Sequence, residues 1–146
     1  MVVLFSWAAF APAAGAGAKE AFVDYYATAS TLINNLNSIA ADLERMNLPT
    51  GDFSDEVAGD TKSRLAKARE GFDSVLTYDD HTDEINEGYI LYIDKMLLAL
   101  MVAQEYRDQG GNERRERLAR ILSESSELRA ELNRKVQRYK KTYGVN

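Results

Sequence analysis

Residues 89–103, YILYIDKMLLALMVA, form the most apolar run in the part of the sequence that carries charge. Asp94 and Lys95 are the only charged residues in this run. A helix of this composition buries apolar side chains over much of its circumference, so other elements must pack around it. The run therefore predicts a central helix, which we expect to extend from about Asp83 to Gln109.

The size and composition of the chain limit what it can be. Its 146 residues are enough for one domain with a real core, and 45% hydrophobic with 28% charged residues is typical of a globular protein. Two prolines and long stretches rich in Ala, Leu, Glu, Lys and Arg favour helices over strands. A net charge of −5 gives no support to nucleic-acid binding. The absence of cysteine excludes disulfides and thiolate metal sites.

Three further segments, at about 19–47, 54–78 and 113–144, repeat apolar or small residues at steps of three and four, which alternate strictly in the first segment. This heptad-like spacing is typical of helices packed side by side, as in coiled coils. The short loops between segments force neighbouring helices to be antiparallel. We therefore predict an all-α, antiparallel up-down-up-down four-helix bundle over residues 19–146. The repeated positions are Phe22, Tyr25, Ala29, Leu32, Leu36, Ile39, Leu43 and Met46; Val57, Thr61, Leu65, Ala68, Phe72 and Val75; and Leu118, Leu122, Ser125, Leu128, Leu132, Val136, Tyr139 and Tyr143.

Residues 1–18 form a separate apolar segment that carries no charge. Residues 2–10 have the length of a signal-peptide hydrophobic region, and two small-x-small cleavage patterns end at Ala16 and Ala18, just before Lys19. The basic residues that usually precede such a region are missing. We expect an export signal, with a retained membrane anchor or assembly arm as the alternative. The run is short for a transmembrane helix.

The predicted central helix is unusual because both of its faces are apolar. Its core face is Ile85, Tyr89, Tyr92, Met96, Ala99, Ala103 and Tyr106. At 100° per residue, a second apolar group falls on the other side of the helix, where a simple bundle is polar. We expect this outer face to bind another protein, or a second copy of this chain, because large exposed apolar patches usually mark interaction sites. The outer face consists of Ile90, Leu91, Leu97, Leu98 and Met101.

Several tyrosines lie at the repeated positions. A ring at such a position usually fills core volume, with its hydroxyl at the edge of the bundle. The alternative is an aromatic ligand pocket between helices. That pocket would be lined by Tyr25, Tyr89, Tyr92 and Tyr106.

An acidic turn precedes the central helix and holds the only histidine. Carboxylates with an imidazole are possible ligands for a divalent metal, but the spacing matches no known signature. Acids at a helix start also interact favourably with the helix dipole. We expect helix capping, with no cofactor. The weaker alternative is a metal site at Asp80, His81, Asp83 and Glu84.

The end of the last helix is basic, with no acidic residue from Leu132 onward. A basic, tyrosine-containing stretch can bind anionic lipid or nucleic acid. In an antiparallel bundle, however, this stretch lies beside the acidic turn, so we expect partial neutralisation and no nucleic-acid partner. The basic residues are Arg134, Lys135, Arg138, Lys140 and Lys141.

No motif assigns a chemistry to the chain. It has one histidine and no cysteine, and it lacks the serine-hydrolase turn and a phosphate-binding loop. We therefore expect a non-enzymatic structural or interaction module, exported or membrane-associated, that assembles through the outer face of the central helix and the N-terminal segment. The alternative is an extracytoplasmic ligand-binding or sensory four-helix bundle.

Overall fold

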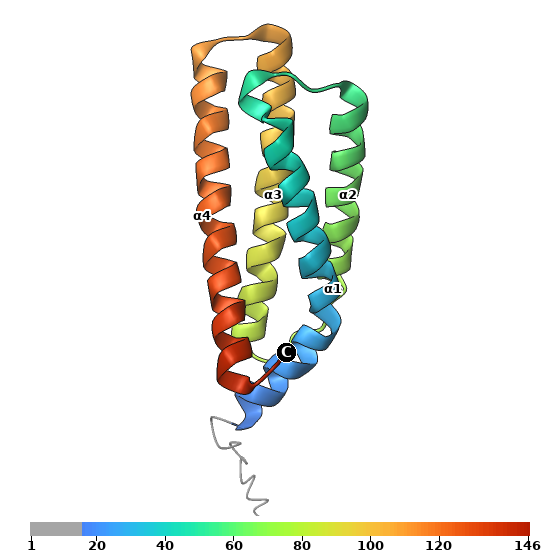
Figure 1. Ribbon diagram of the computed structural model, residues 1–146, viewed down its shortest axis with the longest axis vertical. Helices are drawn as coiled ribbons and strands as arrows, with labels where there is room; N and C mark the ends of the chain where they lie inside the picture. Colours follow the sequence, from blue (N-terminus) through green and yellow to red (C-terminus); the bar gives the residue numbers. More distant parts are fainter. Residues whose placement is uncertain (1–15) are drawn as a thin grey trace, which may run out of the picture.

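The computed structural model describes residues 16–146, which contain helices and no strand. The elements are α1 (Ala16–Met46), the short 3-10 helix η1 (Leu48–Thr50), α2 (Asp55–Asp73), α3 (Asp80–Gln109) and α4 (Asn112–Tyr143). The prediction of an all-α domain is confirmed. In Figure 1 each successive long helix runs along the long axis in the opposite direction to the one before. Most of the apolar N-terminal segment, residues 1–15, lies outside the described residues.

The helix ends follow local capping chemistry. At the start of α2 the Ser54 hydroxyl accepts a hydrogen bond from the backbone N–H of Val57 at 3.2 Å. At the start of α3 Asp79 and Thr82 form a capping box, in which each side chain accepts a hydrogen bond from the other's backbone N–H. The last helix ends at Gly144, whose φ of 67° suits glycine best. These caps mark the starts of α2 and α3 and the end of α4.

Helix α3 lies between α2 and α4 in Figure 1, with α1 in front of it, and its most extensive packing is against α4. All members of its predicted core face are buried except Tyr106, which is half-buried. Because α3 packs against three helices, its buried surface is wider than one stripe. The additional buried apolar residues are Ile93, Leu100 and Val102.

Helix α2 differs from the sequence prediction in length and in the burial of its first turn. It ends at Asp73 rather than near Tyr78, so it has 19 residues. Val57, predicted to face the core, is 47% exposed, and its neighbour Ala58 is buried instead. Ser54 caps this end, and the buried stripe of α2 starts one residue later than the apolar pattern suggested. The connection after α2 is largely open, with Leu76 70% exposed.

Two glycines allow helices to approach closely. A Cβ on Gly88 of α3 would lie 2.5 Å from Leu132 Cδ2 of α4, and a Cβ on Gly71 of α2 would lie 2.6 Å from Leu32 Cδ2 of α1. Real Cβ contacts are longer than these distances, so a side chain at either position would require the facing leucine to shift. The two glycines therefore allow the close α3–α4 and α1–α2 contacts at these levels.

One buried amide joins α1, α2 and α3. Asn86 of α3 donates from Nδ2 to the backbone oxygen of Phe72, near the end of α2, at 2.9 Å. Its Oδ1 accepts a hydrogen bond from the Tyr25 hydroxyl of α1 at 3.3 Å. Both polar side chains are almost fully buried, and each supplies a hydrogen-bond partner that water cannot supply there. The α1, α2 and α3 register is therefore fixed by hydrogen bonds as well as by apolar packing.

Candidate functional site

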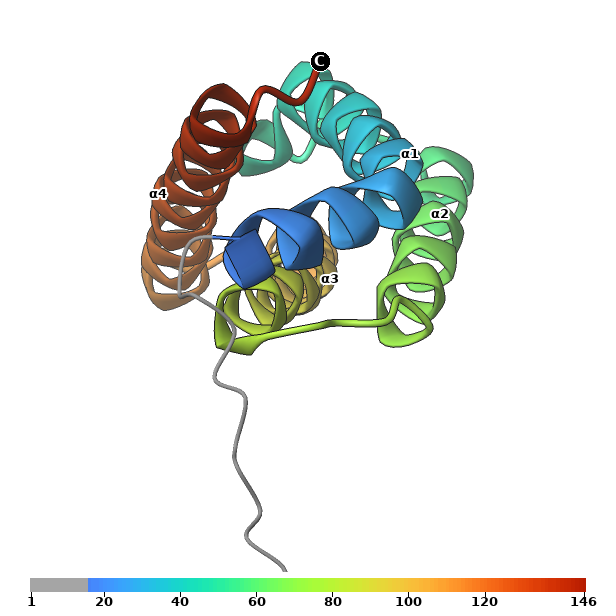
Figure 2. The ribbon, with the colours of Figure 1, turned by 90° about the horizontal axis from the view of Figure 1, so that it is seen from below.

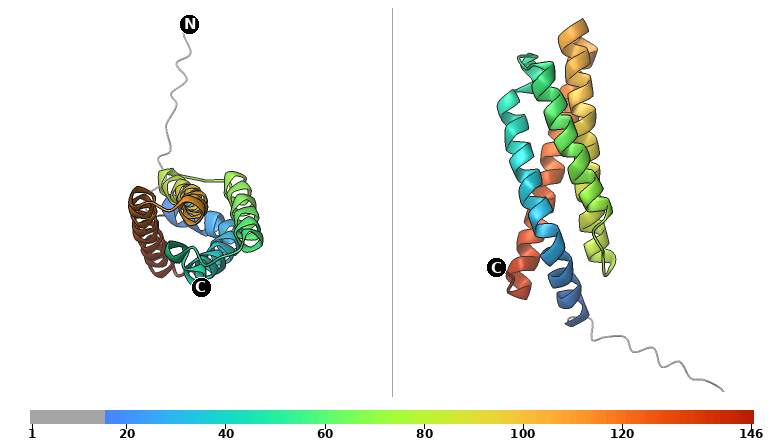
Figure 3. Two further views of the ribbon diagram at one scale, coloured as in Figure 1. Left: turned by 90° about the horizontal axis from the view of Figure 1, so that it is seen from above. Right: turned by 90° about the vertical axis from the view of Figure 1, so that its right-hand side faces the viewer.

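A cleft of about 260 Å³ opens between the second half of α1 and the middle of α4. Helix α1 contacts α4 far less than α3 does, and the end-on views in Figures 2 and 3 show α1 crossing the bundle obliquely. The floor of the cleft is formed by Tyr92 and Met96 of α3. The remaining lining residues are Ala40, Leu43, Glu44, Asn47, Leu48, Pro49, Leu122, Ser125, Ser126 and Arg129.

The turn after α1 closes the upper end of this cleft. Asn47 has a φ of 50°, a left-handed conformation that asparagine tolerates better than most residues. The chain then reverses into η1, where Leu48 is 2% exposed and η1 contacts both α3 and α4. The Leu48 side chain is therefore buried between α3 and α4. The asparagine and the proline of Asn47-Leu48-Pro49 indicate that a helix ends here. They do not indicate that Leu48 inserts between α3 and α4.

An ion pair crosses the mouth of the cleft. Arg129 Nη1 of α4 lies 2.9 Å from Glu44 Oε1 of α1, and its Nε donates to Asn37 Oδ1 at 3.4 Å. The Glu44 side chain is 72% exposed, whereas that of Arg129 is 26% exposed. The positive charge is thus held against the cleft, and its partner lies mostly in water.

Tyr92 contributes a polar atom to the floor. Its side chain is 3% exposed, and burial raises the pKa of its phenol, a rise that the nearby Arg129 guanidinium opposes. The hydroxyl therefore stays protonated at neutral pH and remains a hydrogen-bond donor. The cleft thus combines an apolar floor with a phenol and a guanidinium.

The serines of the cleft do not form a catalytic arrangement. Ser125 is buried, and its hydroxyl donates to the backbone oxygen of Ile121, one turn earlier in α4, at 2.6 Å. Ser126 is exposed at the rim. The only histidine, His81, is in the first turn of α3, at the opposite end of the bundle from η1. The cleft therefore has no histidine next to a hydroxyl nucleophile.

The four tyrosines predicted to line one pocket do not converge. Tyr25 and Tyr89 are core residues, and the Tyr89 hydroxyl donates to Asn133 Oδ1 of α4 at 3.4 Å. Burial raises the pKa of both phenols well above the usual value. Tyr92 lines the α1–α4 cleft. Tyr106 lines a separate open hollow near Gly110 and Gly111. Core packing thus accounts for two of them.

The predicted outer face of α3 is only partly exposed. Leu91 and Met101 are 50% and 47% exposed. Ile90, Leu97 and Leu98 are half-buried and pack against the core. The exposed residues of this side, together with the half-buried Leu98 and Glu105, form a narrower stripe at alternating steps of four and three, here called the α3 stripe. It consists of Glu87, Leu91, Asp94, Leu98, Met101 and Glu105.

Asp94 and Lys95 point toward different neighbours. Arg69 Nε of α2 lies 2.7 Å from Asp94 Oδ1, and Lys95 Nζ lies 2.9 Å from Glu124 Oε2 of α4. Adjacent residues on a helix diverge by about 100°, so each pairs across a different groove. Asp94 and Lys95 therefore form ion pairs that join α3 to α2 and to α4.

The acidic turn is used for capping. Asp79 caps α3 through Thr82, and Asp80 and Asp83 occupy its first turn, where acids favour the helix dipole. His81 lies near an aromatic ring of α4. Within residues 16–146, no group of three or more histidine, aspartate and glutamate side chains lies close enough together to hold a metal ion.

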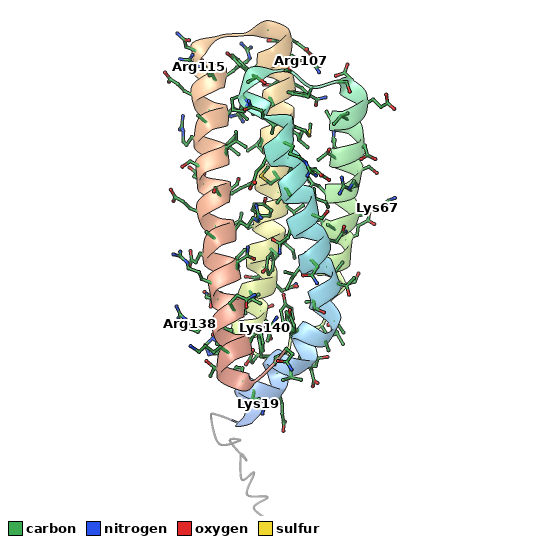
Figure 4. The ribbon with its side chains drawn as sticks, in the orientation of Figure 1. Lys19, Lys67, Arg107, Arg115, Arg138 and Lys140 are labelled. Carbon is green, nitrogen blue, oxygen red and sulfur yellow. The ribbon has the colours of Figure 1, made fainter. Side chains whose placement is uncertain are left out.

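The basic residues at the end of α4 lie beside this turn. Lys135 Nζ is 2.7 Å from Glu84 Oε1, and it lowers the pKa of that carboxyl. Lys140 Nζ lies over the Tyr26 ring of α1, 5.0 Å from its centroid. Figure 4 places Lys140 at the same end of the molecule as Lys19. The other basic residues of the cluster are exposed: Arg134, Arg138 and Lys141.

At the opposite end, Arg107 anchors the α1–α2 connection to α3. Its Nη1 donates to the Phe53 backbone oxygen at 3.1 Å, and its guanidinium carbon lies 5.0 Å from the Phe53 ring centroid. Its Nη2 lies 2.6 Å from Asp55 Oδ1. The Arg107 stem also packs where Gly51, with a φ of 70°, leaves room. Arg107 therefore has a structural role.

Among residues 16–146, no helix combines the length and the apolar character needed to cross a bilayer. Comparison of the chain with protein-family models, with curated proteins and with solved structures gives no significant match. The α1–α4 cleft and the α3 stripe are the features of residues 16–146 that bear on function.

Proposed function

We propose that this chain is a non-enzymatic helical interaction module, an up-down-up-down four-helix bundle that is exported or held at a membrane. Its α3 stripe would pack against another protein chain, first of all a second copy of itself. The main support is the spacing of Leu91, Leu98 and Met101, which is the spacing found where two helices pack side by side. Leu91 and Met101 are exposed and Leu98 is half-buried, although α3 is the most heavily packed helix. The apolar N-terminal segment supports export or membrane association, because its composition resembles a signal or anchor.

The experiment that tests this proposal changes only exposed positions of the α3 stripe. Leu91→Glu combined with Met101→Glu should abolish association measured by light scattering and leave the helix content by circular dichroism unchanged. The matched control is Val57→Glu combined with Leu76→Glu, which adds the same two charges at residues that are 47% and 70% exposed but lie outside α3. Association that persists in the double variant contradicts the proposal.

Leu97 and Leu98 are poorer positions for this test. Both are half-buried and pack against the core, so a glutamate there would destabilise the fold itself. The exposed positions separate loss of binding from loss of folding.

A second candidate function, ligand binding within the bundle, is favoured by the α1–α4 cleft. Its volume of about 260 Å³ and its mixture of apolar and polar walls suit a small molecule. The ligand would be held by Tyr92, Arg129 and the surrounding aliphatic side chains rather than by the tyrosine set expected from spacing.

A further inference from the structure

We infer that the α1–α4 cleft binds a small amphipathic monocarboxylate, with its carboxylate on Arg129 and its apolar body against α3. This inference rests on the second candidate function and specifies the ligand class. It does not depend on the fate of residues 1–18, because every residue that lines the cleft lies between Ala40 and Arg129.

The size and walls of the cleft define the apolar part of the ligand. Pockets for drug-sized ligands start at roughly 300 Å³, so a cleft of about 260 Å³ suits a smaller molecule. Leu43, Leu48, Met96 and Leu122 surround this space from four different elements. Such a lining favours an aliphatic or aromatic body over a sugar or a nucleotide, since polar ligands would lose hydrogen bonds to water there.

The charges at the mouth define the polar part. Arg129 is the less exposed member of its ion pair with Glu44, and Asn37 also holds its Nε. A guanidinium presents paired N–H donors that match the two oxygens of a carboxylate. An exposed ion pair such as Glu44–Arg129 contributes little, so a ligand carboxylate can replace Glu44 at small cost.

Tyr92 supplies a second donor from the floor of the cleft. Its buried phenol remains protonated, so it can donate to an oxygen acceptor and not to an ammonium group. The cleft thus offers donors from α3 and α4 near its charged edge. An ammonium ligand would meet Arg129 as a like charge, so the polarity of the site selects an anion.

The test uses the full-length chain and three eight-carbon probes: octanoate, octanol and octylammonium. Binding is measured by isothermal titration calorimetry and by thermal shift. Octanoate should bind with one-to-one stoichiometry, and octanol and octylammonium at least about tenfold more weakly, because they lack the charge-assisted contact. Octanoate should fail to bind Ser126→Phe, in which a ring at the exposed rim occupies the mouth.

Two charge variants of cleft residues and one control variant outside the cleft test the role of charge. Arg129→Gln should weaken octanoate binding about tenfold, whereas Arg138→Gln, an exposed arginine of the same helix outside the cleft, should leave it unchanged. Glu44→Gln should tighten binding by about two- to fivefold, because it removes the competing carboxylate from Arg129. A cation-binding site gives the opposite sign for Glu44→Gln. Circular dichroism confirms that each variant is folded.

The outcomes separate the ligand class from the cleft function. Equal binding of octanoate and octanol, or no effect of Arg129→Gln, overturns the carboxylate inference but leaves ligand binding in the cleft standing. Tighter binding of octylammonium also overturns it and assigns the charge role to Glu44. No heat and no thermal shift with any of the three probes overturns the inference together with the second candidate function.

Discussion

Replacing one glycine of α3 by alanine tests the packing that places α3 at the centre. A Cβ on Gly88 would lie 2.5 Å from Cδ2 of Leu132, which is 5% exposed and has little room to move. Alanine in a helix interior gains about 1 kcal/mol over glycine, while overpacking a core costs about 1–3 kcal/mol. Gly88→Ala should therefore lower the free energy of unfolding by about 1 kcal/mol.

Gly59 of α2 is the matched control, because a Cβ there meets nothing within 4 Å. Gly59→Ala should raise the free energy of unfolding by about 0.5–1 kcal/mol, so the two variants should differ by about 2 kcal/mol. For a domain of this size, the difference corresponds to melting temperatures about 6 °C apart. Urea unfolding followed by circular dichroism measures both free energies.

A double-variant cycle identifies the contact responsible. Leu132→Ala should cost less in the Gly88→Ala background than in the unmodified chain, since removing the leucine also relieves the clash. If Gly88→Ala stabilises the protein as much as Gly59→Ala does, then α3 and α4 do not approach each other closely at Gly88.

Three further predictions concern polar groups. Asn86→Leu should lower the free energy of unfolding, measured in urea, by about 1–3 kcal/mol, because it leaves the buried Tyr25 hydroxyl without its partner. A smaller loss for Asn86→Leu than for Tyr25→Phe would contradict this prediction. Asp42 and Glu84 have carboxyl pKa values lowered mainly by side-chain hydrogen bonds from Arg64 and Lys135, so the unfolded chain binds protons more readily. Stability should therefore be fully present above their usual pKa values of 3.8 and 4.5 and fall as pH drops through the lowered values, and a urea midpoint that rises on acidification would contradict this. Arg107→Ala should accelerate amide hydrogen exchange in residues 51–54, which it holds against α3, with little change at the opposite end of the bundle.

The helices could be predicted because each carries its own pattern. The core face of α3 follows from apolar residues at steps of three and four, and the turn at 79–84 carries acids where a helix starts. The lengths were harder to predict. Val75 and Leu76 continue the apolar pattern of α2, but Ser74 already caps that helix, so the apolar pattern outlasts the helix.

The cleft could not be predicted, because it depends on how α1 and α4 diverge. Arg129 and Glu44 are separated by 85 residues, and nothing in the local sequence of either indicates the other. The reversal at Asn47 and the insertion of Leu48 set the upper boundary of the cleft, and both depend on tertiary packing. The tyrosine spacing showed which rings face inward, but it did not distinguish a ring that fills the core from one that lines a cleft.

Self-association through the α3 stripe is tested most directly by the molar mass in solution. Light scattering coupled to size exclusion measures this mass across a concentration series. The full chain, with a monomer mass of 16.4 kDa, should be compared with a chain that begins at Lys19, whose monomer is correspondingly lighter. We expect each chain to exceed its own monomer mass, because the interface is the α3 stripe. A full chain that associates while the shorter one stays monomeric would place the interface on the N-terminal segment instead. Monomers from both chains at every concentration would contradict self-association through the α3 stripe.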